Sequence, residues 1–95
     1  MDVHPGVILR DGPAGPRAVI VGGPDVHEVI GAMRATRQAE PGISADELLL
    51  LVSENTGVDL DHIHVAIAYC ADFPDEIDAL VLEAEGAEQA MLRAI

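Results

Sequence analysis

With 95 residues the chain has the length of one domain, and 49% hydrophobic residues supply a core although only 2% are aromatic. A single cysteine excludes an internal disulfide, and no apolar run approaches the ~18 residues that a membrane span needs. We therefore expect a soluble, cytoplasmic protein without membrane contacts. Because a domain this small has a poor ratio of surface to volume, we also expect a homodimer.

The formal net charge of −12 is unevenly distributed. Residues 1–39 hold four arginines and four acidic residues, whereas residues 40–95 hold thirteen acidic residues against one arginine, which gives −12. Such a segment repels phosphate and attracts basic surfaces. Two interpretations stay open: a solvated acidic surface that keeps the protein soluble, or attraction to a basic partner.

The N-terminal residues 1–23 predict a loose arm followed by a β-hairpin. The short apolar runs Val7–Leu9 and Ala18–Val21 are separated by the turn-rich segment Asp11–Pro16. The arm is expected over Met1–Gly6. Since a lone two-stranded ribbon is marginal in water, the hairpin must pack on helices or pair with another chain.

The next segment, residues 24–73, predicts three helices. The Gly22-Gly23 pair predicts a tight turn before a helix over 25–39. A phosphate-binding loop is not expected there, because the segment lacks the motifs of such loops. Ser44 and Glu47 form a capping box for the second helix, and Asn55-Thr56-Gly57 is expected to end it, with Gly57 free to take a positive φ. The fold class is thus mainly α, with a short hairpin before a three- to four-helix, helix-turn-helix-like bundle.

The third helix, within Gly57–Asp72, is apolar on nearly every side and is expected to lie at the centre. Asp59 is expected to cap its N-terminus with its side chain. The stripe at helical spacing consists of Ile63, Ala66, Ile67 and Cys70, and Val65, Ala68 and Tyr69 widen it.

The last segment, residues 74–95, predicts a helix that begins at Pro74. Its apolar stripe is interrupted only by Glu88, and its members are our candidate partner-binding residues: Ile77, Leu80, Val81, Ala84, Met91, Leu92 and Ile95. The stripe either packs on its own domain or binds a partner or second copy, because three heptads are few for a free coiled coil.

No catalytic, cofactor or metal site is expected, so the chain is not predicted to be an enzyme. His62 and His64 are two residues apart and point to different faces of a helix. Cys70 lies on the predicted buried face without a basic neighbour, which predicts an unreactive thiol. No group of nucleophile, base and orienting residue can be assembled.

A helix-turn-helix layout also raises the possibility of DNA binding. The start of the third helix, which would enter the major groove, carries Asp59 and Asp61 and no arginine or lysine. The candidate DNA contacts are His62 and His64 on this helix with Arg34 and Arg37 on the first. The aspartates cost affinity for DNA, so this function is the alternative and not the first hypothesis.

The order of short motifs resembles domain-of-unknown-function family 433, the VapB-like antitoxins. They are HPGVIL, RAVIVGGPDV, PGISADELLLLV and GVDLDHIHVAIAYCADFPDEID, which together extend from His4 to Leu82. The core Ala66-Ile67-Ala68-Tyr69 stands where the family carries a similar one. The departure is Gly22-Gly23-Pro24, where the family usually has Gly-Thr-Arg, so the role of that arginine is not carried over.

The resemblance implies an antitoxin of a toxin–antitoxin pair, whose usual partner is a PIN-like ribonuclease and which represses its own operon as a dimer. The acidic C-terminal half suits the first role, because it can cover the cationic RNA groove of a nuclease. The same charge opposes operator binding. Our hypothesis from the sequence is therefore an antitoxin-like interaction protein, with a DNA-binding autorepressor as the alternative.

Overall fold

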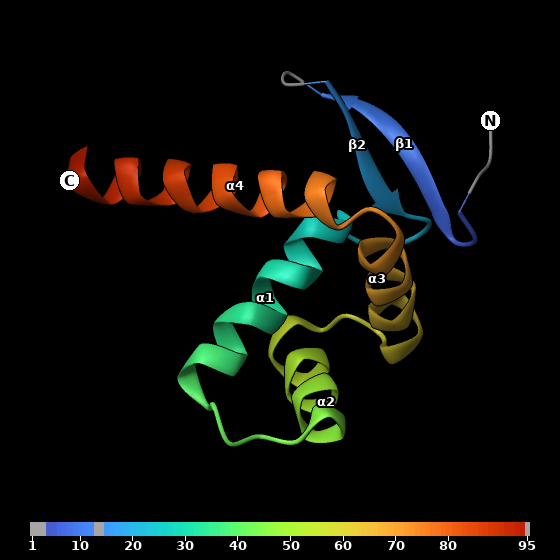
Figure 1. The fold of residues 1–95 in the computed structure, drawn as a ribbon, viewed down its shortest axis with the longest axis vertical. Coiled ribbons are helices and arrows are strands. Elements are labelled where there is room, and N and C mark those ends of the chain that lie inside the picture. Colours follow the sequence, from blue (N-terminus) through green and yellow to red (C-terminus); the bar gives the residue numbers. More distant parts are fainter. Residues whose placement is uncertain (1–3, 13–14, 95) are drawn as a thin grey trace.

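The computed structural model of the chain describes residues 4–12 and 15–94 (Figure 1). Within these residues an antiparallel hairpin precedes four helices, which confirms the predicted fold class. The elements are β1 (Val7–Gly12), β2 (Gly15–Ile20), α1 (Val26–Ala39), α2 (Ala45–Thr56), α3 (Leu60–Asp72) and α4 (Pro74–Ala94).

The hairpin strands are longer than the sequence predicted. Their register runs from Val7 opposite Ile20 to Gly12 opposite Gly15, so most of the expected loop Asp11–Pro16 is paired strand. Pro16 is compatible with this pairing because both strands of a two-stranded ribbon are edges. Val21 was predicted to belong to the second strand, but it lies in the turn that follows.

The hairpin is stabilised by packing on the helices, as a two-stranded ribbon requires. Val7, Ala18 and Ile20 are buried and share one apolar core with residues of all four helices. The turn after β2 is tight: Gly22 has φ of 74° and the backbone N–H of Gly23 donates to the carbonyl of Ile20 at 2.9 Å. This is the turn that the glycine pair predicted.

The helix ends match the predicted signals in two of three cases. The Ser44 hydroxyl accepts a 3.2 Å hydrogen bond from the backbone N–H of Glu47, as expected for a cap. Gly57 ends α2 in the left-handed conformation with φ of 75°. Asp59 does hold the N-cap position of α3, but its side chain makes no capping hydrogen bond within the described chain, so that prediction was wrong.

Two helices share the centre of the fold, not α3 alone. Both α1 and α3 contact each of the other helices and β2. On α3 the fully buried residues are Ile63, Ala66 and Tyr69, whereas Ile67 and Cys70 are only partly buried and Ala68 is exposed. The apolar surface of α3 is therefore wider than the core that covers it.

The first turns of α4 belong to this core, but the rest of the helix leaves it. Ile77 and Val81 are its buried residues, at 0% and 3% exposure. Beyond them α4 projects away from the other helices (Figure 1). None of the helices in residues 4–12 and 15–94 combines the length and the apolar character that crossing a membrane requires.

Candidate interaction surface

The outer part of α4, which we define as residues 82–94 and call outer α4, contributes nothing to the core. Every one of its residues is exposed. Leu82, Met91 and Leu92 are 67%, 66% and 65% exposed, which makes them the most exposed large apolar residues of the described chain. Of these, Met91 and Leu92 belong to the predicted stripe, and exposed apolar residues of this size on a projecting helix are typical of a candidate interaction surface.

The predicted partner-binding stripe is divided at Val81. Ile77 and Val81 are buried in their own domain and Leu80 is half-buried, so they are not available to a partner. The exposed members are Ala84, Met91 and Leu92, whereas Ile95 lies outside the described residues. The inner half of the stripe therefore packs on its own domain, whereas the described part of the outer half is exposed.

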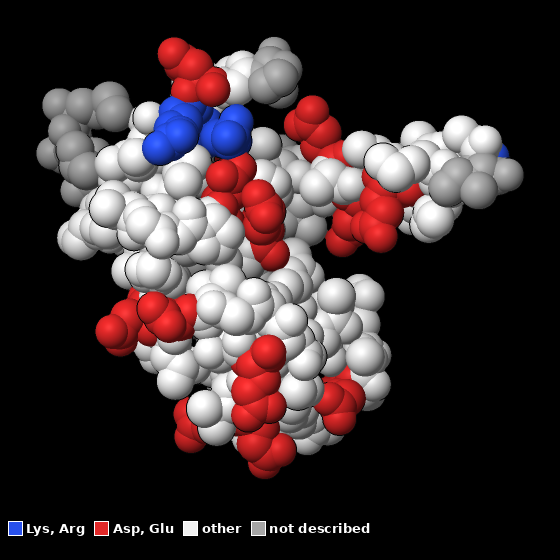
Figure 2. All heavy atoms as spheres, turned by 180° about the vertical axis from the view of Figure 1, so that it is seen from behind, with Lys and Arg blue, Asp and Glu red and all other residues white. Residues whose placement is uncertain are grey.

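Charge on outer α4 is acidic. Its carboxylates belong to Glu83, Glu85 and Glu88, and Arg93 near its end is its cation. Figure 2 shows acidic side chains along the projecting helix and on the distant helical end, with a basic cluster beside the hairpin. In the hairpin Arg10 and Arg17 lie directly opposite each other. Outer α4 therefore has a negative surface that attracts cationic groups.

A hollow of about 370 Å³ opens between α1 and outer α4. From α4 it is lined by Val81, Ala84, Glu85 and Glu88, so Ala84 is the stripe residue of outer α4 that borders it. The opposite wall includes Gly31 of α1 and the carboxylate-bearing Glu28. Small side chains and carboxylates around an open hollow suit a basic side chain inserted by a partner.

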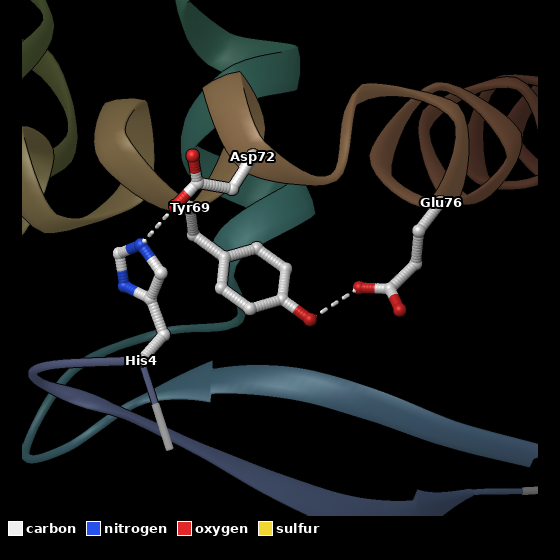
Figure 3. Close-up of polar contacts among 4 residues, drawn as sticks. All are labelled: His4, Tyr69, Asp72 and Glu76. Atoms are coloured by element: carbon white, nitrogen blue, oxygen red, sulfur yellow. Dashed lines mark hydrogen bonds and ion pairs between the residues drawn. The ribbon is translucent and has the colours of Figure 1, made fainter. Parts of the chain in front are cut away.

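The direction of α4 is set by polar contacts at its first turns. The phenol of Tyr69 on α3 donates a 2.6 Å hydrogen bond to Glu76 (Figure 3). Burial, reinforced by this bond and by the Glu76 charge, raises the pKa of Tyr69 to about 12. Arg34 of α1 forms an ion pair with Asp78. These contacts fix the first turns of α4 to α1 and α3, and outer α4 extends from there.

The segment predicted as a loose arm is anchored from His4 onward, so that prediction was wrong for this part. His4 is linked through Nε2 to a carboxylate oxygen of Asp72, 3.0 Å away, and its ring meets Tyr69 edge-on at 5.3 Å between centroids (Figure 3). Gly6 accepts a 2.9 Å hydrogen bond from the backbone of Val21. Met1–Val3 lie outside the described residues.

A groove of about 620 Å³ lies between α1, α2 and α3. Its apolar lining includes Ile30, Met33, Leu48 and Ile67, and Arg34 and Arg37 supply charge. Cys70 also lines it, and burial raises the pKa of this thiol more than nearby Arg34 lowers it. The groove therefore presents an apolar surface with guanidinium groups, and its cysteine is predominantly a thiol at neutral pH.

One group of potential metal ligands occurs in the described chain. Ligand atoms of Asp25, His27 and Glu28 lie within 4.8 Å of one another. However, the Nε of Arg17 is 2.6 Å from a carboxylate oxygen of Asp25. A guanidinium so close opposes a bound cation, so this group is better described as an ion-pair network at the start of α1.

The four candidate DNA contacts are not joined into one site. His64 is exposed and His62 is half-buried, with its Nδ1 beside Gly23 near the hairpin. Arg34 and Arg37 instead line the groove, whose α3 residues begin at Ile67. Within residues 4–12 and 15–94 no hydrogen bond or ion pair connects the histidines with the arginines.

Sequence reasoning missed the groove and the contacts that anchor α4. Both depend on residues that are far apart in the chain, such as Arg34 and Asp78. A local sequence motif cannot predict such a pair. Comparison with protein families, characterised proteins and solved structures found no match for this chain.

Proposed function

We propose that this chain is an antitoxin-like interaction protein that binds and neutralises a partner toxin, a PIN-like ribonuclease, through outer α4. The observation that carries the proposal is the exposure of every residue from Leu82 to Ala94 on an anchored, projecting helix. This segment is not needed to bury the core, yet it carries large apolar side chains. Such a segment is suited to recognition by a groove in another protein.

Neutralisation follows from the charge of the same segment. A ribonuclease must hold its phosphate-bearing substrate in a cationic groove. Glu83, Glu85 and Glu88 on outer α4 offer carboxylates to that groove, while Met91 and Leu92 bury apolar surface beside them. The helix would compete with RNA for the same cations, so binding and inhibition are one event.

The first test removes the segment without touching the core. A chain that ends at Val81 keeps all the buried residues of α4, so it is expected to fold and to show normal helical circular dichroism. Co-purification with the product of the adjacent gene, together with inhibition of its ribonuclease activity, should be lost. Undiminished binding by this folded truncation would overturn the proposal.

A matched pair of substitutions tests the stripe itself. Leu92 lies on the stripe, whereas Leu82 is separated from all its members by spacings other than three or four, and both are about equally exposed at 65% and 67%. Leu92→Glu should weaken partner binding by at least about tenfold, as expected when an apolar residue that the partner buries becomes charged. Leu82→Glu introduces the same charge and should have little effect. Equal effects of the two changes would contradict recognition through the stripe.

The alternative, DNA binding by an autorepressor, has less support. Asp59 and Asp61 stand at the start of α3 and would face phosphates, and Arg34 already pairs with Asp78. A gel-shift assay with the upstream DNA of the gene at ~50 mM salt, where non-specific binding is strong, distinguishes the two functions. Saturable binding to this DNA would favour the alternative.

A further inference from the structure

The geometry points to a homodimer in which outer α4 of each copy lies in the α1–α3 groove of the other. The inference uses the same surface as the proposed function, because outer α4 would serve both a partner and a second copy. Self-association and partner binding would then exclude each other. Three observations carry this arrangement: two incomplete apolar surfaces, their charges, and the direction of α4.

The two apolar surfaces belong to the same chain, and neither is fully covered within the described residues. The groove, of about 620 Å³, is lined by the buried Ile30 and by Met33 and Ile67, which are half-buried. Outer α4 exposes Met91 and Leu92 on a stretch about 20 Å long, at 1.5 Å per residue. Mutual burial of both surfaces removes apolar area from water twice in a two-fold symmetric dimer.

Charge determines which helix fits the groove. Glu88 is the charged residue that interrupts the apolar stripe of α4, so a site that buries the stripe must supply a cation for it. The groove supplies Arg37, which forms no ion pair within the described residues and donates only a long 3.4 Å hydrogen bond to the carbonyl of Ile43. Arg37 in one copy and Glu88 in the other are therefore complementary.

The occupant must come from a second molecule. Helix α4 is continuous from Pro74 to Ala94, and Figure 1 shows it extending away from the other helices. The Arg34–Asp78 ion pair and the Tyr69–Glu76 hydrogen bond hold its first turns in that direction. A straight, anchored helix cannot turn back into the groove of its own chain.

A charge-reversal cycle on the full chain tests this arrangement by sedimentation velocity, with no partner present. The wild-type chain is expected to dimerise, and Arg37→Glu or Glu88→Arg alone should each raise the dissociation constant by at least about tenfold. Combining both changes should restore dimerisation to near the wild-type value, because the pair is reversed in sign. Arg10→Glu on the hairpin is the matched control, since it makes the same change far from the groove and should leave the dimer intact. Circular dichroism verifies that each variant is folded.

Three outcomes would overturn the arrangement: a monomeric wild-type chain, a dimer that neither single change weakens, or a double variant that stays dissociated. These outcomes are separate from the fate of the proposed function. A monomer that still binds the ribonuclease through outer α4 would refute the exchanged dimer alone. A charge-sensitive dimer with no affinity for the neighbouring gene product would refute the antitoxin function alone.

Discussion

Tyr69 and Glu76 are joined across the break between α3 and α4, where the phenol donates a 2.6 Å hydrogen bond to the carboxylate. The bond connects the last turn of one helix with the first turn of the next. Phe73 between them packs its ring against Tyr69 with 4.8 Å between centroids. The orientation of the projecting helix is therefore linked to a buried residue of the core.

The first prediction concerns the titration of Tyr69. Its pKa is raised from 10.0 to about 12, chiefly by burial and then by Glu76. Because the folded-state value is the higher one, this contribution to stability is complete below pH 10 and is lost as the pH rises through 12. The chain has one tyrosine and no tryptophan, so tyrosinate absorbance follows this residue alone.

The absorbance midpoint should lie well above that of the same protein in urea. Tyr69→Phe removes the donor to a charged acceptor, so it should lower the free energy of unfolding by about 1.5–3 kcal/mol. It should also reduce the loss of stability above pH 10, and Cys70, whose pKa is likewise raised, accounts for part of what remains. Coincident midpoints in the folded and unfolded protein would show that the phenol is not held by Glu76.

The second prediction compares two apolar residues of α4. Ile77 is completely buried, so Ile77→Ala should lower the free energy of unfolding by about 2–5 kcal/mol. Leu92 is 65% exposed, so Leu92→Ala should change it by less than about 0.5 kcal/mol. Urea unfolding at low protein concentration measures both without a contribution from association. Similar losses from both changes would place outer α4 in the core.

The third prediction compares the two N-cap residues Ser44, of α2, and Asp59, of α3. Ser44→Ala deletes an observed capping hydrogen bond and should cost about 1 kcal/mol. Asp59 occupies the same position of α3 without such a bond, so Asp59→Ala should cost only the helix-dipole term of about 0.3–1 kcal/mol at low salt. Added salt should reduce the cost at Asp59 and leave the cost at Ser44 nearly unchanged.

The fourth prediction compares two glycines that both have open space around a new Cβ. Gly57 has φ of 75°, so Gly57→Ala should destabilise by about 1–2 kcal/mol for conformational reasons alone. Gly86 lies inside α4, where alanine is favoured over glycine by about 0.5–1 kcal/mol. Gly86→Ala should therefore increase helical circular dichroism. A loss of helix there would mean that outer α4 needs a bend at this position.

Local signals in the sequence predicted the order and type of the elements well. The Ser44 cap, the Gly57 stop and the Pro74 start are each decided by a few neighbouring residues, and all three stand where expected. The hairpin length was missed because strand register continues past Asp11 through pairing with Pro16, and composition alone does not contain that pairing. In the sequence, turn-forming residues that belong to paired strands give the same signal as a loop.

Contacts between distant segments could not be predicted in the same way. His4 appeared to belong to a loose arm because its partner, Asp72, is 68 positions away. The stripe predicted that Ile77 and Leu92 belong to one face of the last helix, but Ile77 is buried and Leu92 is exposed, because the periodicity is the same on both sides of Val81. Burial of α4 ends where the other helices and the hairpin no longer cover it, and this depends on the whole fold.

The boundary at Val81 has an evolutionary consequence. Substitutions in outer α4 leave the packing of the body intact, so this stretch is free to diverge without a penalty in folding. New binding specificities would arise there first, while the hairpin and the shorter helices remain constrained by the packing of the core. Duplicated copies of such a gene would therefore differ most in the last thirteen or so residues of this helix, a stretch about 20 Å long.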